Sequence, residues 1–211
     1  MPGGRPSGGF PREGGQMHKV LRNTLVLVLA TILTLSVQAT SAYAHSSEVF
    51  DPLDVAATVP ALYDIVHAKV TEQIGKGTFY FETEVAGQIP ETPTGPSGNP
   101  RFVAWNWVIA PGTPQAANVI VRYCSHTIQA PCVGDAWHWE SALVTSSGQV
   151  VGVFPFKVDG PTVKAYVDVG LLGGPALTQF GWFALTRNAP GVSGAAPSDR
   201  APDVGTVPFV R

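Results

Sequence analysis

Short runs of alternating apolar and polar residues, each ended by glycine or proline, most constrain how this 211-residue chain folds. Between Thr78 and Val85, the odd-numbered positions hold Phe, Phe, Thr and Val, and the even-numbered positions are mostly polar. A repeat of two places alternate side chains on opposite faces of a β-strand. This segment is therefore predicted to be a strand with one buried face.

Seven other segments are rich in Val, Phe, Trp, Tyr and Ile, which pleated, half-buried surfaces favour. They are Asp64–Val70, Arg101–Ile109, Asn118–Cys124, Trp137–Val144, Gln149–Phe154, Thr162–Asp168 and Gln179–Thr186. Turn-forming glycine, proline and aspartate separate them, and no long amphipathic helix interrupts them. About eight strands predict an all-β antiparallel sandwich, jelly-roll or immunoglobulin-like, with a closed barrel as the alternative.

The segment from Met17 to Ala44 has the order of a secretory signal peptide. Its basic residues (His18, Lys19 and Arg22) precede a 13-residue apolar run, Leu25–Val37, and small residues end it. Because that run is shorter than the roughly 20 residues that span a bilayer, an uncleaved anchor is only the alternative. Residues 1–16 are interpreted as a leader or a mis-assigned start. We expect a single secreted domain, residues 45–211, with an irregular tail at 188–211.

The charge of the expected secreted part argues against nucleic acid as a partner. Four of the 13 basic residues and one of the 15 acidic residues precede His45, which leaves a net charge near −5. Nucleic acids and anionic lipids bind clustered Lys and Arg, and no basic run is present. We therefore expect no nucleic-acid partner. After cleavage of the signal peptide, we also expect no membrane span.

Cys124 and Cys132 are the two cysteines of the chain. An even number of cysteines in an oxidising compartment predicts a disulfide. The loop that it closes is short, and the chain-entropy model gives such a bridge roughly 2–3 kcal/mol of stability. A metal site is the alternative, but no second Cys/His pair of zinc spacing accompanies these residues.

Six short motifs are spread over most of the expected domain. They are Asp64-Ile65, Ala68-Lys69-Val70, Phe79-x-Phe81, Val85-Ala86-Gly87-x-Ile89-Pro90, Trp105-Asn106-Trp107 and the Asp-Arg-Ala-Pro-Asp segment from Asp199 to Asp203. In these motifs the chain resembles a loose group of secreted bacterial proteins, which is similar to β-sandwich domains of the carbohydrate-binding and cytochrome-like (DOMON) type. The resemblance implies export and a β-sandwich, and it implies no particular activity.

Paired tryptophans are the first candidate for a ligand site. Trp137 and Trp139 share one face of a predicted strand, and His138 and Glu140 share the other. Exposed indoles stack on the flat C–H faces of sugar rings, so Trp137, His138, Trp139 and Glu140 are predicted to bind a glycan. The alternative is that the indoles fill the core, as large aromatic side chains commonly do; this holds also for Trp105 and Trp107.

Aspartates near the two ends of the domain are the candidate metal ligands. Asp51, Asp54 and Asp64 precede the first predicted strand, and Asp199 and Asp203 lie near the end of the chain. Calcium takes six to eight oxygen ligands, so Asp51, Asp54, Asp64 and Asp203 are predicted to form a structural calcium site. The alternative is that these side chains cap turns without a metal.

His45 would become the first residue after cleavage and offer an α-amine and an imidazole to copper, as in secreted polysaccharide monooxygenases. Such a site needs a second histidine, which His67, His126 or His138 would have to supply. Haem held by Met and His is excluded because no methionine follows Met17, and hydrolase motifs are absent. We therefore expect a non-enzymatic secreted module that binds a ligand or associates with a surface, with a glycan or another extracellular polymer as its ligand. The alternatives are a copper oxidase built on His45 and a structural envelope protein without a ligand.

Overall fold

The computed structural model describes residues 45–52, 59–95, 97–126, 132–174, 177–189 and 197–211. All of them belong to the second of two compact units, residues 42–211. The predicted leader and signal peptide, residues 1–44, lie outside the described residues. No helix in the described ranges is long and apolar enough to cross a membrane.

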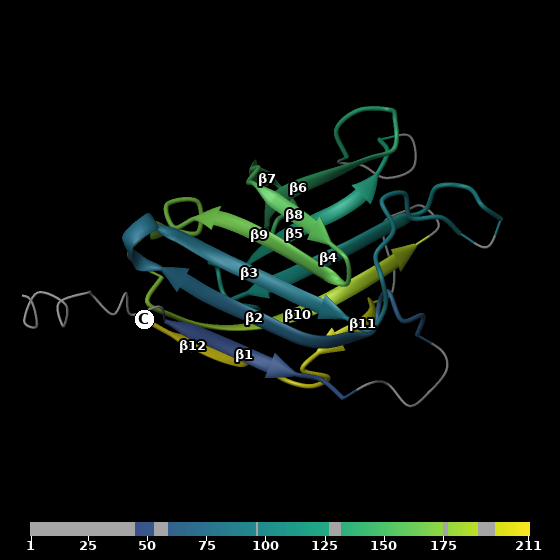
Figure 1. Cartoon of the computed structure of the whole chain (residues 1–211). Coiled ribbons are helices and arrows are strands. Elements are labelled where there is room, and N and C mark those ends of the chain that lie inside the picture. The colour runs from purple at the N-terminus through teal and green to yellow at the C-terminus, as the bar shows by residue number, and fades with distance from the viewer. Residues whose placement is uncertain (1–44, 53–58, 96, 127–131, 175–176, 190–196) are drawn as a thin grey trace, which may run out of the picture. The chain divides into compact units, whose positions relative to one another are not determined.

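Twelve strands and one short 3-10 helix make up the described fold (Figure 1). The helix is η1 (Ile74–Lys76), and the strands are β1 (Ser46–Phe50), β2 (Ile65–Gln73), β3 (Thr78–Val85), β4 (Phe102–Ile109), β5 (Ala117–Cys124), β6 (His138–Thr145), β7 (Val150–Gly152), β8 (Phe156–Asp159), β9 (Thr162–Asp168), β10 (Gln179–Ala189), β11 (Pro197–Ala201) and β12 (Val207–Val210). They form two packed antiparallel sheets, so the predicted all-β sandwich is confirmed.

The first sheet has the strand order β1-β2-β3-β9-β8, and the second has the order β11-β10-β4-β5-β6-β7. The last strand, β12, also pairs with β10, at the first four residues of β10 (179–182). Because all of these pairs are antiparallel, each strand presents alternate side chains to the space between the sheets. In Figure 1 the two sheets lie as two layers, with β1 and β12 side by side.

The core lies between the sheets and is rich in aromatic side chains. Trp105 and Trp107 of β4 and Trp182 of β10 have no exposed surface. The Trp107 ring packs on Phe81 of the opposite sheet with ring centroids 5.7 Å apart, and its Nε1 donates to the Glu82 carbonyl at 3.3 Å. The alternative interpretation of Trp105 and Trp107 as core residues is therefore correct.

The tail was expected to be irregular, and the structure differs. Residues 188–211 contain the end of β10 and the whole of β11 and β12. These two strands add to the same edge of β10, where Arg200 lies opposite Leu185 and Phe209 opposite Phe180. β11 and β12 pair with the backbone groups that β10 exposes at that edge. The amino-acid composition of residues 188–211 alone does not indicate this pairing.

The two long sides of the sandwich differ. On one side, the Ser47 hydroxyl of β1 donates to the Pro208 carbonyl of β12 at 2.7 Å and accepts from Trp182 Nε1 at 3.0 Å. On the other side, the chain crosses from β7 to β8, and Ser141 Oγ accepts from the Phe154 amide at 3.0 Å. A groove opens on this second side.

Candidate functional site

The groove lies between β6 of one sheet and β8 of the other. It encloses about 320 Å³, at the lower end of the range for small-molecule sites. Its lining residues are Ile89, Glu91, Trp139, Phe156, Lys157 and Val158. An aromatic and aliphatic floor is thus bordered by one acidic and one basic side chain.

Trp139 is positioned by its place in β6. It lies opposite Tyr123 of β5, so its side chain points between the sheets. The indole packs on Trp105 and Tyr123 with ring centroids 5.8 and 5.4 Å apart, and its Nε1 donates to the Glu91 carbonyl at 2.8 Å. The ring is held on three sides, and it remains half-buried because the sandwich is open at the groove.

The opposite wall comes from the edge strand β8. Phe156 and Val158 turn inward and are half-buried, whereas Lys157 is exposed. The amide of Ile89 donates to the Gly160 carbonyl at 3.0 Å, which ties the loop after β3 to the turn after β8. The groove walls are therefore fixed by backbone hydrogen bonds.

Lys157 keeps its charge at the rim of the groove. Its ammonium donates to Asp159 Oδ2 at 2.5 Å. This hydrogen bond raises the pKa of Lys157 and lowers the pKa of Asp159. Lys157 is therefore cationic, and its ammonium is paired with Asp159 on the exposed face of β8.

The predicted platform residues are placed on two different faces. Trp137 and Trp139 turn toward the core, with Trp137 stacked on Tyr123 at 5.5 Å, so they do not form an open platform on a sheet face. His138 and Glu140 point to the outer face of the same sheet. Of the two indoles, only Trp139 lines the groove.

Arg122 is a buried charge that the sequence analysis missed. It lies opposite Glu140 in the sheet, and its Nε and Nη2 donate to Glu140 Oε1 at 2.7 and 2.5 Å. The opposite charges at facing positions of β5 and β6 were the signal for this pair. The Arg122–Glu140 pair lies on the outer face of the sheet, away from the groove.

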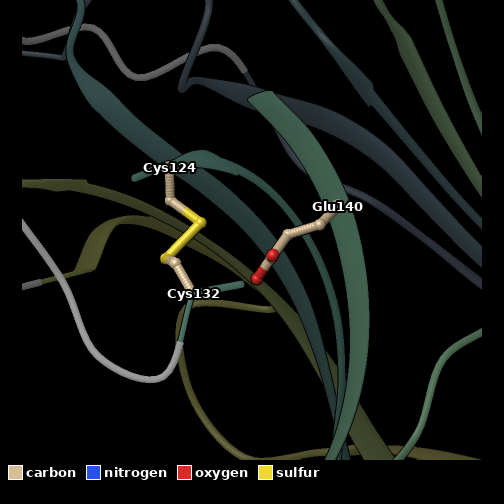
Figure 2. Close-up of side chains that lie close together, drawn as sticks. All are labelled: Cys124, Cys132 and Glu140. Atoms are coloured by element: carbon tan, nitrogen blue, oxygen red, sulfur yellow. A yellow bond between two sulfur atoms is a disulfide. The ribbon is translucent and has the colours of Figure 1, made fainter. Parts of the chain in front are cut away.

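The predicted disulfide is present. Cys124, the last residue of β5, is bonded to Cys132, with Cα atoms 6.2 Å apart, within the usual range for a bridge. Both residues are buried and pack with Phe102 and Ala104. Figure 2 shows the bridge beside the carboxylate of Glu140.

Three aspartates from the two ends of the domain meet. One carboxylate oxygen each from Asp51, Asp199 and Asp203 lies within 4.8 Å of the others. Of the predicted calcium ligands, Asp51 and Asp203 are thus together, and Asp199 replaces Asp64, which is not part of this cluster. Asp54 lies outside the described residues.

His45 contacts Glu72, a side chain with only 3 % of its surface exposed. Its Nδ1 lies 3.4 Å from Glu72 Oε2, and its carbonyl accepts from the Glu72 amide at 2.8 Å. His67 lies five residues before Glu72 along β2, which is roughly 17 Å at about 3.4 Å per residue.

His126 and His138 lie at the opposite end of the domain from His45. His138 faces Cys124 at the Phe102 end of the second sheet, whereas Arg211, which binds Glu72, lies beside Thr178 at the start of β10. Of the four described histidines, the structure therefore brings none of the other three to His45.

A larger cavity, of about 500 Å³, lies at the end of the sandwich where β4 ends and β10 begins. Its lining is uncharged: Ala110, Pro111, Thr113, Gln115, Leu172, Gly173, Leu177, Gln179, Phe180, Gly181 and Thr206. It contains no tryptophan and no ionisable group, so it differs in chemistry from the groove.

The fold and the groove together define the class of this chain: a two-sheet antiparallel β-sandwich with an aromatic groove along one side. Comparison with family models, curated proteins and solved structures finds no match to the chain.

Proposed function

We propose that the chain is a secreted, non-catalytic module that binds a glycan or a similar hydroxylated polymer in the groove between β6 and β8. The observation that carries the proposal is the half-buried indole of Trp139 in the floor of this groove. An indole offers a large apolar surface whose orientation is here fixed by the hydrogen bond to Glu91. A fixed aromatic surface suits the flat C–H face of a sugar ring.

The border of the groove supplies the polar contacts that such a ligand needs. Lys157 offers ammonium donors, and Glu91 offers carboxylate acceptors. Hydrogen bonds with an ionised partner are shorter and stronger than those between neutral groups. Sugar hydroxyls both donate and accept, so they match one basic and one acidic side chain placed around an apolar floor.

The open sides of the groove suit a polymer. The groove lies along the edge strand β8, so a chain of sugars can extend past it in both directions. We expect weak binding per sugar unit, because a small groove buries little of each ring. Binding to a polymer surface then gains from repeated units.

A glycan array probed with the full chain tests the proposal, followed by titration of the best ligand by calorimetry. Trp139→Phe keeps most of the core packing and is expected to weaken binding at least fivefold. Lys157→Ala removes an exposed side chain and is expected to weaken binding severalfold without loss of stability.

Two matched controls accompany these variants. Trp137→Phe changes an indole that does not line the groove, and Lys76→Ala removes an exposed lysine of η1. Both are expected to bind like the unmodified chain. Equal losses in Trp137→Phe and Trp139→Phe, or no glycan bound at all, would contradict the proposal.

A further inference from the structure

The disulfide and Glu140 form a compact cluster on the outer face of the second sheet, and His138 contacts Glu140. The sulfur atoms of Cys124 and Cys132 and one carboxylate oxygen of Glu140 all lie within 4.8 Å of one another. Figure 2 shows the carboxylate of Glu140 pointing toward the bridge. Two sulfurs and a carboxylate at this spacing match the ligand types of a zinc site.

The carboxylate of Glu140 is held in place by other groups. Arg122 donates two hydrogen bonds to Oε1, and the Val133 amide donates to Oε2 at 2.9 Å. Only 6 % of the Arg122 side chain and 12 % of the Glu140 side chain are exposed. A ligand arriving at Oε2 therefore meets an oriented acceptor.

His138 is oriented in the way that metal-binding histidines usually are. Its Nδ1 lies 2.8 Å from the Ala136 carbonyl, and its Nε2 lies 3.1 Å from Glu140 Oε2. Both partners are acceptors, and a neutral imidazole has one N–H. When Nδ1–H donates to the carbonyl, the lone pair of Nε2 is available to a cation beside Glu140 Oε2. A backbone carbonyl accepting from the second ring nitrogen is typical of histidine bound to a metal.

We propose that the reduced chain binds one Zn²⁺ at this cluster, through the sulfurs of Cys124 and Cys132, the carboxylate of Glu140 and His138 Nε2. A thiol or phosphine reductant supplies the two electrons that open the S–S bond, and each sulfur takes up one proton. When zinc binds, both thiol protons leave to solvent and two Zn–S bonds form. The disulfide and the zinc site use the same sulfur atoms, so each state excludes the other.

Two properties of the site favour zinc over other ions. Thiolate and imidazole ligands select zinc and copper over calcium and magnesium, and two sulfurs, one nitrogen and one oxygen give the four ligands of a tetrahedral site. The Arg122 guanidinium remains on Oε1, outside the ligand set. The proposal does not depend on what the groove binds.

The test compares the full chain with the bridge intact and after reduction by a phosphine, which leaves no competing thiol. Co²⁺ is the spectroscopic probe, because cobalt bound to thiolate shows a sulfur-to-metal charge-transfer band. Zn²⁺ content after gel filtration gives the stoichiometry. We expect the charge-transfer band and one zinc per reduced chain, and neither for the oxidised chain.

Variants separate this site from adventitious binding. Cys132→Ser, Glu140→Gln and His138→Gln are expected to weaken zinc binding tenfold or more. His126→Gln is the matched control, because His126 follows Cys124 by two residues but lies beside Asp135 at 4.0 Å instead of Glu140. It is expected to bind zinc like the unmodified reduced chain.

Circular dichroism distinguishes loss of the site from loss of the fold. If Glu140→Gln unfolds because Arg122 loses its partner, Cys132→Ser and His138→Gln decide the question. The proposal is overturned if the reduced chain binds no stoichiometric zinc, or if Cys132→Ser binds zinc as tightly as the unmodified chain. It is equally overturned if reduction unfolds the chain and zinc does not restore its spectrum.

Discussion

Glu72 sits near the end of β2, where the first and last described segments of the chain meet. Arg211 donates to both of its carboxylate oxygens, with Nε at 2.9 Å from each, and His45 approaches from the other side. The hydrogen bond from Arg211 is the main cause that lowers the pKa of Glu72, burial opposes it, and His45 lowers it further. One nearly buried carboxylate of β2 therefore contacts the residue before β1 and the residue after β12.

Replacing Glu72 by Gln is expected to lower the free energy of unfolding by about 1.5–3 kcal/mol, because hydrogen bonds to charged groups have about this value. The folded-state pKa is below the usual 4.5, so the contribution is complete above pH 4.5 and is lost as the pH falls through the folded pKa. Denaturant unfolding of both proteins from neutral to acidic pH measures this. The difference in the free energy of unfolding between the unmodified chain and Glu72→Gln should become smaller at acidic pH.

Glu48→Gln is the matched control, because Glu48 is an exposed glutamate of β1 that contacts Lys69 at 3.7 Å. Its effect is expected to stay below about 1 kcal/mol at every pH. A difference between Glu72→Gln and the unmodified chain that does not change with pH would contradict the account of Glu72.

Gly87, two residues after β3, tests backbone packing at a single position. A Cβ there would lie 2.9 Å from Ala61 Cβ and 3.1 Å from the Leu62 amide nitrogen. Gly87→Ala is expected to destabilise the fold by about 1–3 kcal/mol, as overpacking does. Gly75→Ala meets no atom within 4 Å and is expected to leave stability unchanged or raise it by about 0.4–1 kcal/mol. Equal melting temperatures for the two variants would contradict the predicted overpacking at Gly87.

At the scale of elements, alternation predicted the strands whose two faces differ. The structure gives β3 and β9 the predicted bounds and shifts the others by a few residues. It adds strands that the sequence does not signal, such as β11, whose Pro-Ser-Asp-Arg-Ala composition disfavours a strand. β11 forms because the edge of β10 offers unpaired backbone groups. Tertiary pairing therefore determined the elements that local preference could not.

The candidate site was also predictable only in part, because its geometry depends on how the strands pair. The aromatic character of the 137–140 segment is visible in the sequence, but its register is not. Trp139 faces Tyr123 and the core because β6 pairs with β5 in that register, and a shift by one residue would have reversed the faces. The groove itself depends on β8, which was not predicted.

The Cys124–Cys132 bridge anchors the end of β5 against the loop before β6. In the chain-entropy model, a bridge between residues eight positions apart contributes about 2–3 kcal/mol. The double variant Cys124→Ser, Cys132→Ser is therefore expected to melt several degrees lower. Differential scanning fluorimetry measures the shift. A melting temperature equal to that of the oxidised chain would contradict this contribution.

One carboxylate oxygen each from Asp51, Asp199 and Asp203 lie together between the end of β1 and the segment around β11, and the predicted calcium site would use them as three of its six to eight ligands. Extracellular calcium modules bind with a Kd of about 10⁻⁴–10⁻³ M. A tenfold excess of calcium over that Kd is expected to stabilise the fold by about 1.4 kcal/mol, which is a rise of roughly 3–6 °C.

Asp203→Asn is expected to remove this rise in melting temperature. Asp135→Asn, at an exposed aspartate between Cys132 and β6, is expected to keep it. A melting temperature that does not respond to calcium in the unmodified chain would contradict the calcium site and favour turn capping by these aspartates.

At the scale of the whole molecule, the sandwich is tied together on one long side and open on the other. Ser47, Trp182 and Pro208 link the sheets at the first side, whereas the groove with Trp139 marks the second. The end cavity is separate and uncharged, and it lies where β4 ends and β10 begins. The central claim is that ligand binding belongs to the lateral groove.

Amide and indole chemical shifts of the isotope-labelled full chain, recorded while the best array glycan is added, test that claim most directly. The account predicts saturable shifts centred on the indole N–H of Trp139, on Ile89 and Glu91, and on Phe156–Val158. Shifts confined to the end cavity, around Gln115 and Gln179, would contradict it, as would an unchanged Trp139 indole signal at saturating glycan.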